Sequence, residues 1–511
     1  MKQSDVLYDL IKSLTGNEKR FFKIYASRHV TSGKNNYVRL FEAIDKLTVY
    51  DDKKLKSQLK IVSSGSNFSV EKNYLYNLIL ECLDIYHKDS SVDRLINKYM
   101  NIARILSEKR LDKQSLTIIK KAEAISEKYN RFENIITLTV LKKNIGFVND
   151  SITLADPDTY YNELFKNINK LKTKVEYTKV RDALLFRRKQ SGPVKNTDDV
   201  LELNTFNLTP YFRDFTRVDS QDANIFYLLA KLEYYRILRD ARKCRTYCLK
   251  LISIFDQHPY RITDHMNLLI YTLNVFIVER LYKTKDEAEQ ALKKIKALPG
   301  LFGKKTLKID LEVKIFEVYC TCITDIALQF RDYESALPSI SETEKGLKKF
   351  QNSISPIFKL VARSNVACIY FGVKRYKESL KWCNDILNDH TEHRDDILYV
   401  VHILYLLNHF ELKNHVILPN LMKAAYRFFY KKKRAYQFEN LFFKYLTLFL
   451  RSETKKEQKQ LFISFREELI PLRENKLENL IFNDIDINWM DRSQTRKSVV
   501  IYPVSLFFCC C

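Results

Sequence analysis

The stretch LVARSNVACIYFGVKRYKESLKWCNDILNDH, residues 360–390, decides the fold. Its apolar residues recur with helical period on both sides of a short break that ends at Tyr376. Ala367 and Ser379 are small residues at places where two antiparallel helices cross closely, whereas Tyr370 and Tyr376 are large enough to fill the space between neighbouring pairs. The stretch therefore predicts an antiparallel helix pair.

Two other segments repeat the break and the start of the second helix. Asp332–Leu337 (DYESAL) lies 43 residues earlier, and Arg110–Leu116 (RLDKQSL) is a looser copy. This order of small and aromatic residues around a turn resembles the tetratricopeptide repeat. The resemblance implies an all-α fold, a right-handed superhelical solenoid of antiparallel helix pairs. The chain departs from the family in its longer helices and in lacking a proline after Leu387.

Composition agrees with a helical array. Nine glycines and ten prolines in 511 residues are too few to supply the turns of an all-β or doubly wound fold. A chain of this length exceeds one ordinary core, so it must split into domains or grow by repetition. Hydrophobic residues make up 46% of the chain, which is enough to build a core and excludes a wholly disordered protein.

Three domains are expected. Residues 1–88 form a separate N-terminal helical module, residues 89–480 form the solenoid with an irregular segment at 173–219, and residues 481–511 form a C-terminal tail. Thr15 with Glu18, and Thr284 with Glu287, have the spacing of capping boxes and predict two helix starts. Helix pairs are expected at approximately 90–130, 131–172, 220–258, 262–298, 306–350, 354–390, 392–432 and 433–475.

The net charge indicates which partners the chain attracts, and the cysteines indicate the redox state of its compartment. The excess of 86 Lys and Arg over 62 Asp and Glu gives a formal charge of +24, which favours anionic partners, unless the lysines merely solvate helix faces. The ten cysteines lack a disulfide pattern and are expected to be small core residues in a reducing compartment. The longest apolar runs, Leu268–Val278 and Ile397–Leu407, are about half the ~20 residues of a membrane-spanning helix. Met1–Leu14 lacks the apolar region of a secretory signal, so a cytoplasmic protein without a membrane partner is expected.

Motifs for catalysis and cofactor binding are missing from the sequence. Gly300 and Gly303 are a close pair without the spacing of a phosphate-binding loop, and neither G-x-S-x-G nor H-E-x-x-H occurs. His390 and His393 could face one metal ion, but no third ligand stands at a fixed spacing. His402 and His409 are expected to pack or to cap. The sequence predicts no catalytic residue, no metal and no cofactor, and hence a protein that is not an enzyme.

One segment is dense in positive charge. It contains six cations and no acidic residue between Leu421 and Arg434, and the cations are interleaved with Tyr426, Phe428, Phe429 and Tyr430. The cations are Lys423, Arg427, Lys431, Lys432, Lys433 and Arg434. Such a mixture can hold phosphates and stack bases, which makes a nucleic-acid-binding regulatory protein the alternative function. The competing interpretation is a buried aromatic helix face that ends in solvated cations, which suit the helix dipole.

The tetratricopeptide resemblance implies a non-enzymatic interaction scaffold. In that family the concave face made by the first helix of each pair binds a peptide or protein segment. The matching positions here are Arg363, Asn365 and Phe371, of which Asn365 would hydrogen-bond the peptide and Arg363 would attract an acidic one. Alternatively Asn365 joins neighbouring repeats, Phe371 belongs to the core, and the groove holds the chain's own tail or a second copy. The sequence leaves the partner and the oligomeric state open.

Overall fold

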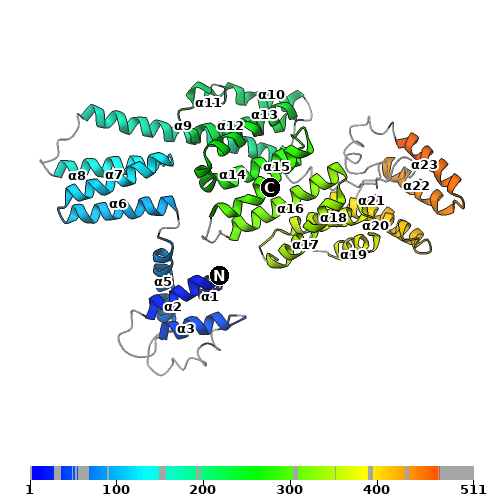
Figure 1. The fold of residues 1–511 in the computed structure, drawn as a ribbon, viewed down its shortest axis with the longest axis horizontal. Helices are drawn as coiled ribbons and strands as arrows, with labels where there is room; N and C mark the ends of the chain where they lie inside the picture. The colour runs from blue at the N-terminus through cyan, green and yellow to red at the C-terminus, as the bar shows by residue number, and fades with distance from the viewer. Residues whose placement is uncertain are drawn as a thin grey trace. The chain divides into compact units, whose positions relative to one another are not determined.

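The computed structural model describes most of the chain as helix. The described residues are 3–27, 36–48, 50–51, 55, 68–88, 91–148, 157–191, 194, 197–213, 215–302, 309–351, 353–389, 395–431, 437–469 and 471. Within these ranges every regular element is an α-helix or a short 3-10 helix, which confirms the all-α fold class (Figure 1). The expected tail, residues 481–511, lies outside the described ranges.

The chain divides into two compact units, Met1–Leu171 and Lys172–Cys511. The first unit contains two hydrophobic clusters. One gathers Leu7, Phe22, Phe41 and Leu75 from the helices α1 (Gln3–Ser13), α2 (Gly16–Ser27), α3 (Asn36–Lys46) and α5 (Phe68–His87). The other joins α6 (Val92–Glu108), α7 (Asp112–Lys128) and α8 (Phe132–Val148). The first 88 residues therefore have a hydrophobic cluster of their own.

Both predicted helix starts are confirmed, although only the first makes both hydrogen bonds of a capping box. The Thr15 N–H donates to Glu18 Oε2 at 2.7 Å, and the Glu18 N–H donates to Thr15 Oγ1 at 3.3 Å. In the second unit the Glu287 N–H donates to Thr284 Oγ1 at 3.3 Å. These contacts satisfy N–H groups that the first turn of a helix leaves without partners.

Helix α9 (Pro157–Ser191) runs across the boundary between the units. The segment 173–219 was predicted to be irregular, and this is wrong for residues 173–191, because Tyr177, Val180 and Leu184 continue the helical period and are buried. Beyond α9 the chain does break into short elements. These are α10 (Thr197–Asn204), η2 (Thr205–Leu208), α11 (Pro210–Arg213) and η3 (Phe215–Arg217).

From Gln221 onward the second unit consists of helices in pairs. Each range predicted for this region holds two helices, and consecutive helices pack together in chain order (Figure 1). First helices also contact first helices, α14 with α16, α16 with α18 and α18 with α20. The pairs are α12 (Gln221–Ile237) with α13 (Ala241–Gln257), α14 (Ile262–Val278) with α15 (Lys285–Ala297), α16 (Ile309–Phe330) with α17 (Tyr333–Lys349), α18 (Pro356–Gly372) with α19 (Tyr376–Leu387), α20 (Asp395–Glu411) with α21 (Leu418–Lys431), and α22 (Gln437–Arg451) with α23 (Lys455–Leu469). The 3-10 helices η4 (Pro259–Arg261) and η5 (Leu298–Phe302) lie between elements of this series.

Five of these pairs turn through the same backbone conformation. The first helix ends in a residue with positive φ whose side chain is Arg or Lys, although glycine is the usual residue there. In the pair of α18 and α19, Lys374 has φ of 63°, its N–H donates to Phe371 O at 2.9 Å, and the Arg375 N–H donates to Tyr370 O at 2.8 Å. The corresponding residues in the second unit are Arg239, Arg280, Arg331, Lys374 and Lys413, and Arg110 and Asn130 have the same role in the first unit.

A small buried residue follows the turn, as the sequence predicts. Ser379 is fully buried and donates from Oγ to Ala367 O at 2.8 Å, so two helix backbones approach closely at this point. Ser115 makes the same contact with Ala103 O at 2.7 Å in the first unit. Ala336 and Cys244 occupy the equivalent place, five residues after the positive-φ residue, and both are buried.

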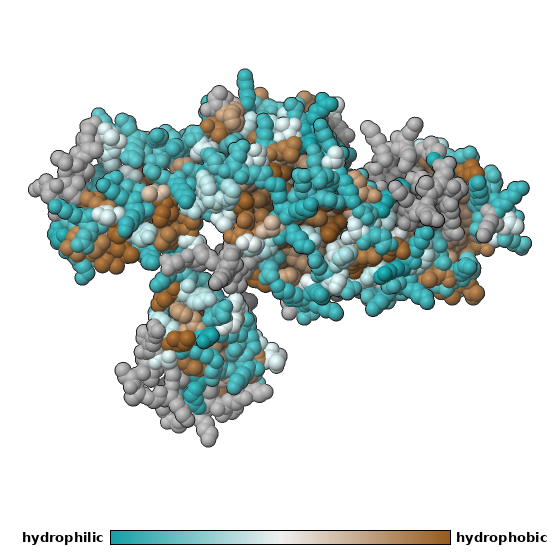
Figure 2. Space-filling model, viewed as in Figure 1, coloured by the Kyte–Doolittle hydropathy of each residue, from teal (hydrophilic) through white to brown (hydrophobic). Residues whose placement is uncertain are grey.

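Cysteines lie in the core of the described structure, and hydrophilic residues dominate the surface drawn in Figure 2. All seven cysteines in the described ranges are buried free thiols, which confirms that they act as small core residues. Burial raises the pKa of Cys320 to about 12. The face drawn in Figure 2 is mostly hydrophilic, with hydrophobic residues between and beneath the charged ones.

Replacing Lys374 by Gly should stabilise the protein. A non-glycine residue at positive φ costs about 1–2 kcal/mol, and glycine removes this cost while losing about 0.5–1 kcal/mol of chain entropy. We expect a net gain of up to about 1 kcal/mol in urea denaturation followed by circular dichroism. Lys381→Gly, in the exposed interior of α19, is the control and should cost about 1 kcal/mol. A loss of stability in both variants would contradict the assigned turn.

Replacing Gly346 by Ala should destabilise the protein. A Cβ at this position in α17 would lie 2.0 Å from the Phe316 ring of α16. Overpacking of this kind costs about 1–3 kcal/mol, which exceeds the gain of up to about 1 kcal/mol from the better helix propensity of alanine. Gly300→Ala, where a Cβ meets nothing within 4 Å, should change the free energy of unfolding by less than about 0.5 kcal/mol. Equal effects of the two substitutions would show that the helices do not approach as described.

Candidate functional site

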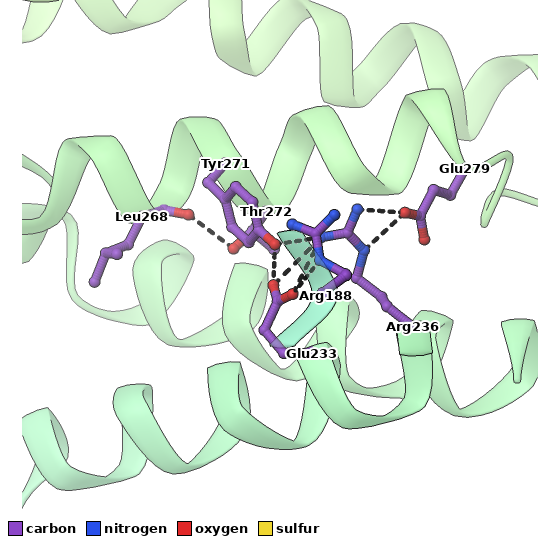
Figure 3. A network of polar contacts seen from close by, with 7 residues as sticks. All are labelled: Arg188, Glu233, Arg236, Leu268, Tyr271, Thr272 and Glu279. Atoms are coloured by element: carbon purple, nitrogen blue, oxygen red, sulfur yellow. Dashed lines mark hydrogen bonds and ion pairs between the residues drawn. The ribbon is translucent and has the colours of Figure 1, made fainter. Parts of the chain in front are cut away.

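The largest concentration of buried charge lies where α9, α12 and α14 meet. Glu233 of α12 is fully buried and accepts a hydrogen bond from Arg188 Nε of α9 at 2.9 Å (Figure 3). The Tyr271 hydroxyl of α14 also donates to Glu233, and Arg236 Nη1 lies 3.3 Å from its Oε1. A buried carboxylate is stable only with such partners, so Glu233 fixes three helices at one point.

Arg236 extends this network to the end of α14. Its Nε donates to Glu279 Oε1 at 2.7 Å, and its Nη2 lies 2.5 Å from the same oxygen. Glu279 directly precedes Arg280, the positive-φ residue that ends α14. The network therefore links α12 to the turn of the next helix pair.

A second buried carboxylate, Asp222, lies near the start of α12. Arg261 Nη1 donates to Asp222 Oδ1 at 2.7 Å, His265 Nε2 lies 3.4 Å from the same oxygen, and Lys174 Nζ of α9 lies 3.5 Å from Oδ2. Burial by itself would raise the pKa of Asp222. The hydrogen bond from His265 and the positive charges of His265, Lys174 and Arg261 outweigh burial and hold the pKa at about 2.

Both carboxylates are bound to cations. The arrangement suits a structural role, in which α9 is held against α12 by Lys174 with Asp222 and by Arg188 with Glu233. Sequence analysis missed the network because its partners are about 40 residues apart. The signal was present, since Asp222, Lys231, Glu233 and Arg236 are charged residues in a helix that is otherwise rich in apolar residues.

The three residues expected to bind a peptide occupy different environments. Arg363 is partly exposed, and its Nη1 donates to Asp389 Oδ2 at 2.8 Å. Asn365 is buried and donates from Nδ2 to Thr324 Oγ1 of α16 at 2.8 Å. Phe371 is buried in the core with its ring 5.3 Å from that of Tyr376. This placement favours the alternative interpretation of Asn365 as a link between repeats and of Phe371 as core, whereas Arg363 is partly exposed and paired with Asp389.

The Asn365 contact is one of a series between neighbouring helix pairs. Cys322 Sγ of α16 donates to Asn274 Oδ1 of α14 at 3.6 Å, and Asn408 Nδ2 of α20 donates to Ser379 Oγ of α19 at 2.8 Å. Each contact joins a polar side chain of one pair to a polar side chain of the next. Neutral buried pairs of this kind fix the register of adjacent helices.

The basic segment of α21 is divided between the core and the surface. Phe429 is fully buried and Phe428 packs beside the His402 ring, 4.5 Å away. Tyr426 and Tyr430 are 42% and 71% exposed, and Lys423 and Arg427 are exposed on the same side of the helix. The side chain of Lys431 and the residues Lys432, Lys433 and Arg434 lie outside the described part of the chain.

Two of the four histidines considered in the sequence, His402 and His409, lie in the described part of the chain. Burial lowers the pKa of His402 to about 4, and His409 Nδ1 lies 3.0 Å from Asn414 Nδ2, so both pack or cap as predicted. His390 and His393 lie outside the described residues. In the part of the chain that the structure describes, no three His, Cys, Asp or Glu side chains are grouped to hold a metal ion.

Comparisons with known proteins found no match to this chain. The chain matches no protein-family model, no curated protein and no solved structure. None of the described helices combines the length and the apolar character needed to cross a membrane.

Replacing Asp222 by Asn should destabilise the second unit in a pH-dependent way. At pH 7 the variant leaves Arg261 and Lys174 without their buried counter-charge, which should cost about 3–5 kcal/mol. Because the folded-state pKa lies below the ordinary value of about 3.9, the carboxylate stabilises the fold above pH 4 and loses this contribution as the pH falls toward 2. Urea denaturation at several pH values should show the difference from wild type shrinking over that window.

The control for this experiment is Asp256→Asn. Asp256 pairs with Lys294, and both side chains are largely exposed. Exposed pairs contribute up to about 1 kcal/mol, so the variant should behave almost as wild type. An Asp222→Asn variant no less stable than Asp256→Asn at pH 7 would contradict the buried network.

Proposed function

We propose that this protein is a non-enzymatic interaction scaffold, in which the paired helices of the second unit form a tetratricopeptide-like, right-handed solenoid. The scaffold binds a segment of a partner protein against the first helices of successive pairs. It needs neither a metal nor a cofactor for this role.

One observation carries the proposal, the recurrence of a single structural unit. Arg239, Arg280, Arg331, Lys374 and Lys413 each end a first helix with positive φ, and the second helix of that pair follows. The first helices α14, α16, α18 and α20 also contact one another in order. Repetition of one turn and one mode of packing is what generates a solenoid, because each pair then relates to the next in a similar way.

The proposed ligand is an acidic peptide. Arg363 lies on a first helix and is partly exposed, and a guanidinium offers five N–H donors in a fork that suits a carboxylate. Asp389 currently accepts from Nη1, so an incoming Asp or Glu side chain or a terminal carboxylate would share or replace that partner. The chain's charge of +24 favours the approach of such a peptide.

Selection of a random peptide library on the full chain tests this function. Peptides enriched in Asp and Glu should be selected, and Arg363→Ala should weaken their binding about 10- to 100-fold, as expected for a charge-assisted hydrogen bond. Asp389→Asn removes the competing carboxylate and should bind at least as well as wild type. Lys377→Ala, an exposed cation on the second helix α19, is the matched control and should bind normally. Selected peptides with no acidic bias, or binding that is indifferent to Arg363→Ala, would rule out the site.

A further inference from the structure

The exposed side of α21 carries two parallel rows of side chains. Lys423 and Arg427 are four residues apart and form a row of cations, and Tyr426 and Tyr430 are four residues apart and form a row of aromatic rings. Residues at this spacing stack one above the other on a helix, with about 5–6 Å between their Cβ atoms. The opposite side of α21 contributes Leu418, Met422, Ala425 and Phe429 to the core. The helix is therefore anchored, and the two rows face outward.

The two tyrosines are among the exposed large side chains of the described residues. Tyr430 is 71% exposed, although a large ring would bury more apolar surface in the core. Tyr426 is 42% exposed and is oriented by an edge-to-face contact with Phe443 of α22, at 5.5 Å between ring centroids. Both rings are thus exposed to solvent beside the cation row.

The charge around these rows is uniformly positive in the sequence. No Asp or Glu occurs from Leu412 to Phe438, so nothing in this segment competes for Lys423 and Arg427. Cations near a helix C-terminus also suit the helix dipole, but this explanation accounts for neither the exposed tyrosines nor their register with the cations.

We propose that this face of α21 binds single-stranded nucleic acid. The cation row would follow the phosphates of successive nucleotides, and Tyr426 and Tyr430 would stack on their bases. A duplex fits less well because its bases are already stacked and paired. An anionic membrane surface also fits less well, because a helix that lies in a membrane interface inserts aliphatic or large apolar side chains, and the exposed side chains of these rows are two tyrosines and two cations.

Fluorescence anisotropy with a labelled oligonucleotide tests the proposal on the full chain. The probes are oligothymidylate and oligouridylate of about 12 nucleotides, within the range of single-strand sites. Binding should weaken as salt rises, and the double variant Lys423→Ala/Arg427→Ala should reduce the slope of log K against log salt by about 1.4 for two phosphate contacts. The control Lys377→Ala/Lys381→Ala changes two exposed cations of α19 and should leave the affinity for the oligonucleotide within about twofold.

The tyrosine variants separate stacking from charge. Tyr430→Ala should weaken binding about 5- to 100-fold, whereas Tyr430→Phe keeps the ring and should bind within about twofold of wild type. Melting temperatures of all variants should match wild type, because the changed side chains are exposed. The proposal is overturned if no oligonucleotide binds at about 50 mM salt, if Tyr430→Ala binds as wild type, or if duplex or anionic vesicles bind better than single strands.

Discussion

The way in which five of the first helices end governs the arrangement of their pairs. A single residue at positive φ, followed by an N–H group that donates to a carbonyl five residues back, closes the helix and sends the chain back along it. The return is tight because a small residue such as Ser379 lies at the crossing and binds the Ala367 carbonyl. A larger residue at that crossing would separate the two helices, and the apolar faces that they present to neighbouring pairs would no longer meet. Packing between pairs thus depends on geometry set within each pair.

The contacts between pairs change character along the second unit. At its start, α12 is surrounded by other helices and is buried on nearly all sides, so Asp222 and Glu233 need cations from α9, α13–α14 and α12 itself. Farther on, buried neutral pairs such as Asn365 with Thr324 link neighbouring pairs, beside partly exposed ion pairs such as Lys285 with Asp332. Neutral pairs carry a smaller desolvation penalty than charges do. The charged network is therefore best understood as what fixes the long helix α9 to the first pair.

Sequence reasoning predicted the local features well, because these depend on near neighbours in the chain. Residue type and spacing over a few positions were enough to predict the helix pairs from Gln221 onward, the helix starts at Thr15 and Thr284, and the close contact at Ser379. Features that depend on distant partners were not predicted. Residues 173–191 were expected to be irregular because basic residues and the Gly192–Pro193 break obscured the buried Tyr177 and Leu184. Asn365 was assigned to a ligand because its partner Thr324 lies 41 positions away.

At the positive-φ residues, the backbone conformation and the side chain have separate roles. Lys374 and Lys413 shape the chain through their backbone, while their exposed side chains take no part in the core. A change of side chain at these positions therefore alters the surface charge without repacking the interior, provided that the left-handed conformation is kept. The turns are therefore places where the surface chemistry of this protein can change at little energetic cost while the backbone stays the same.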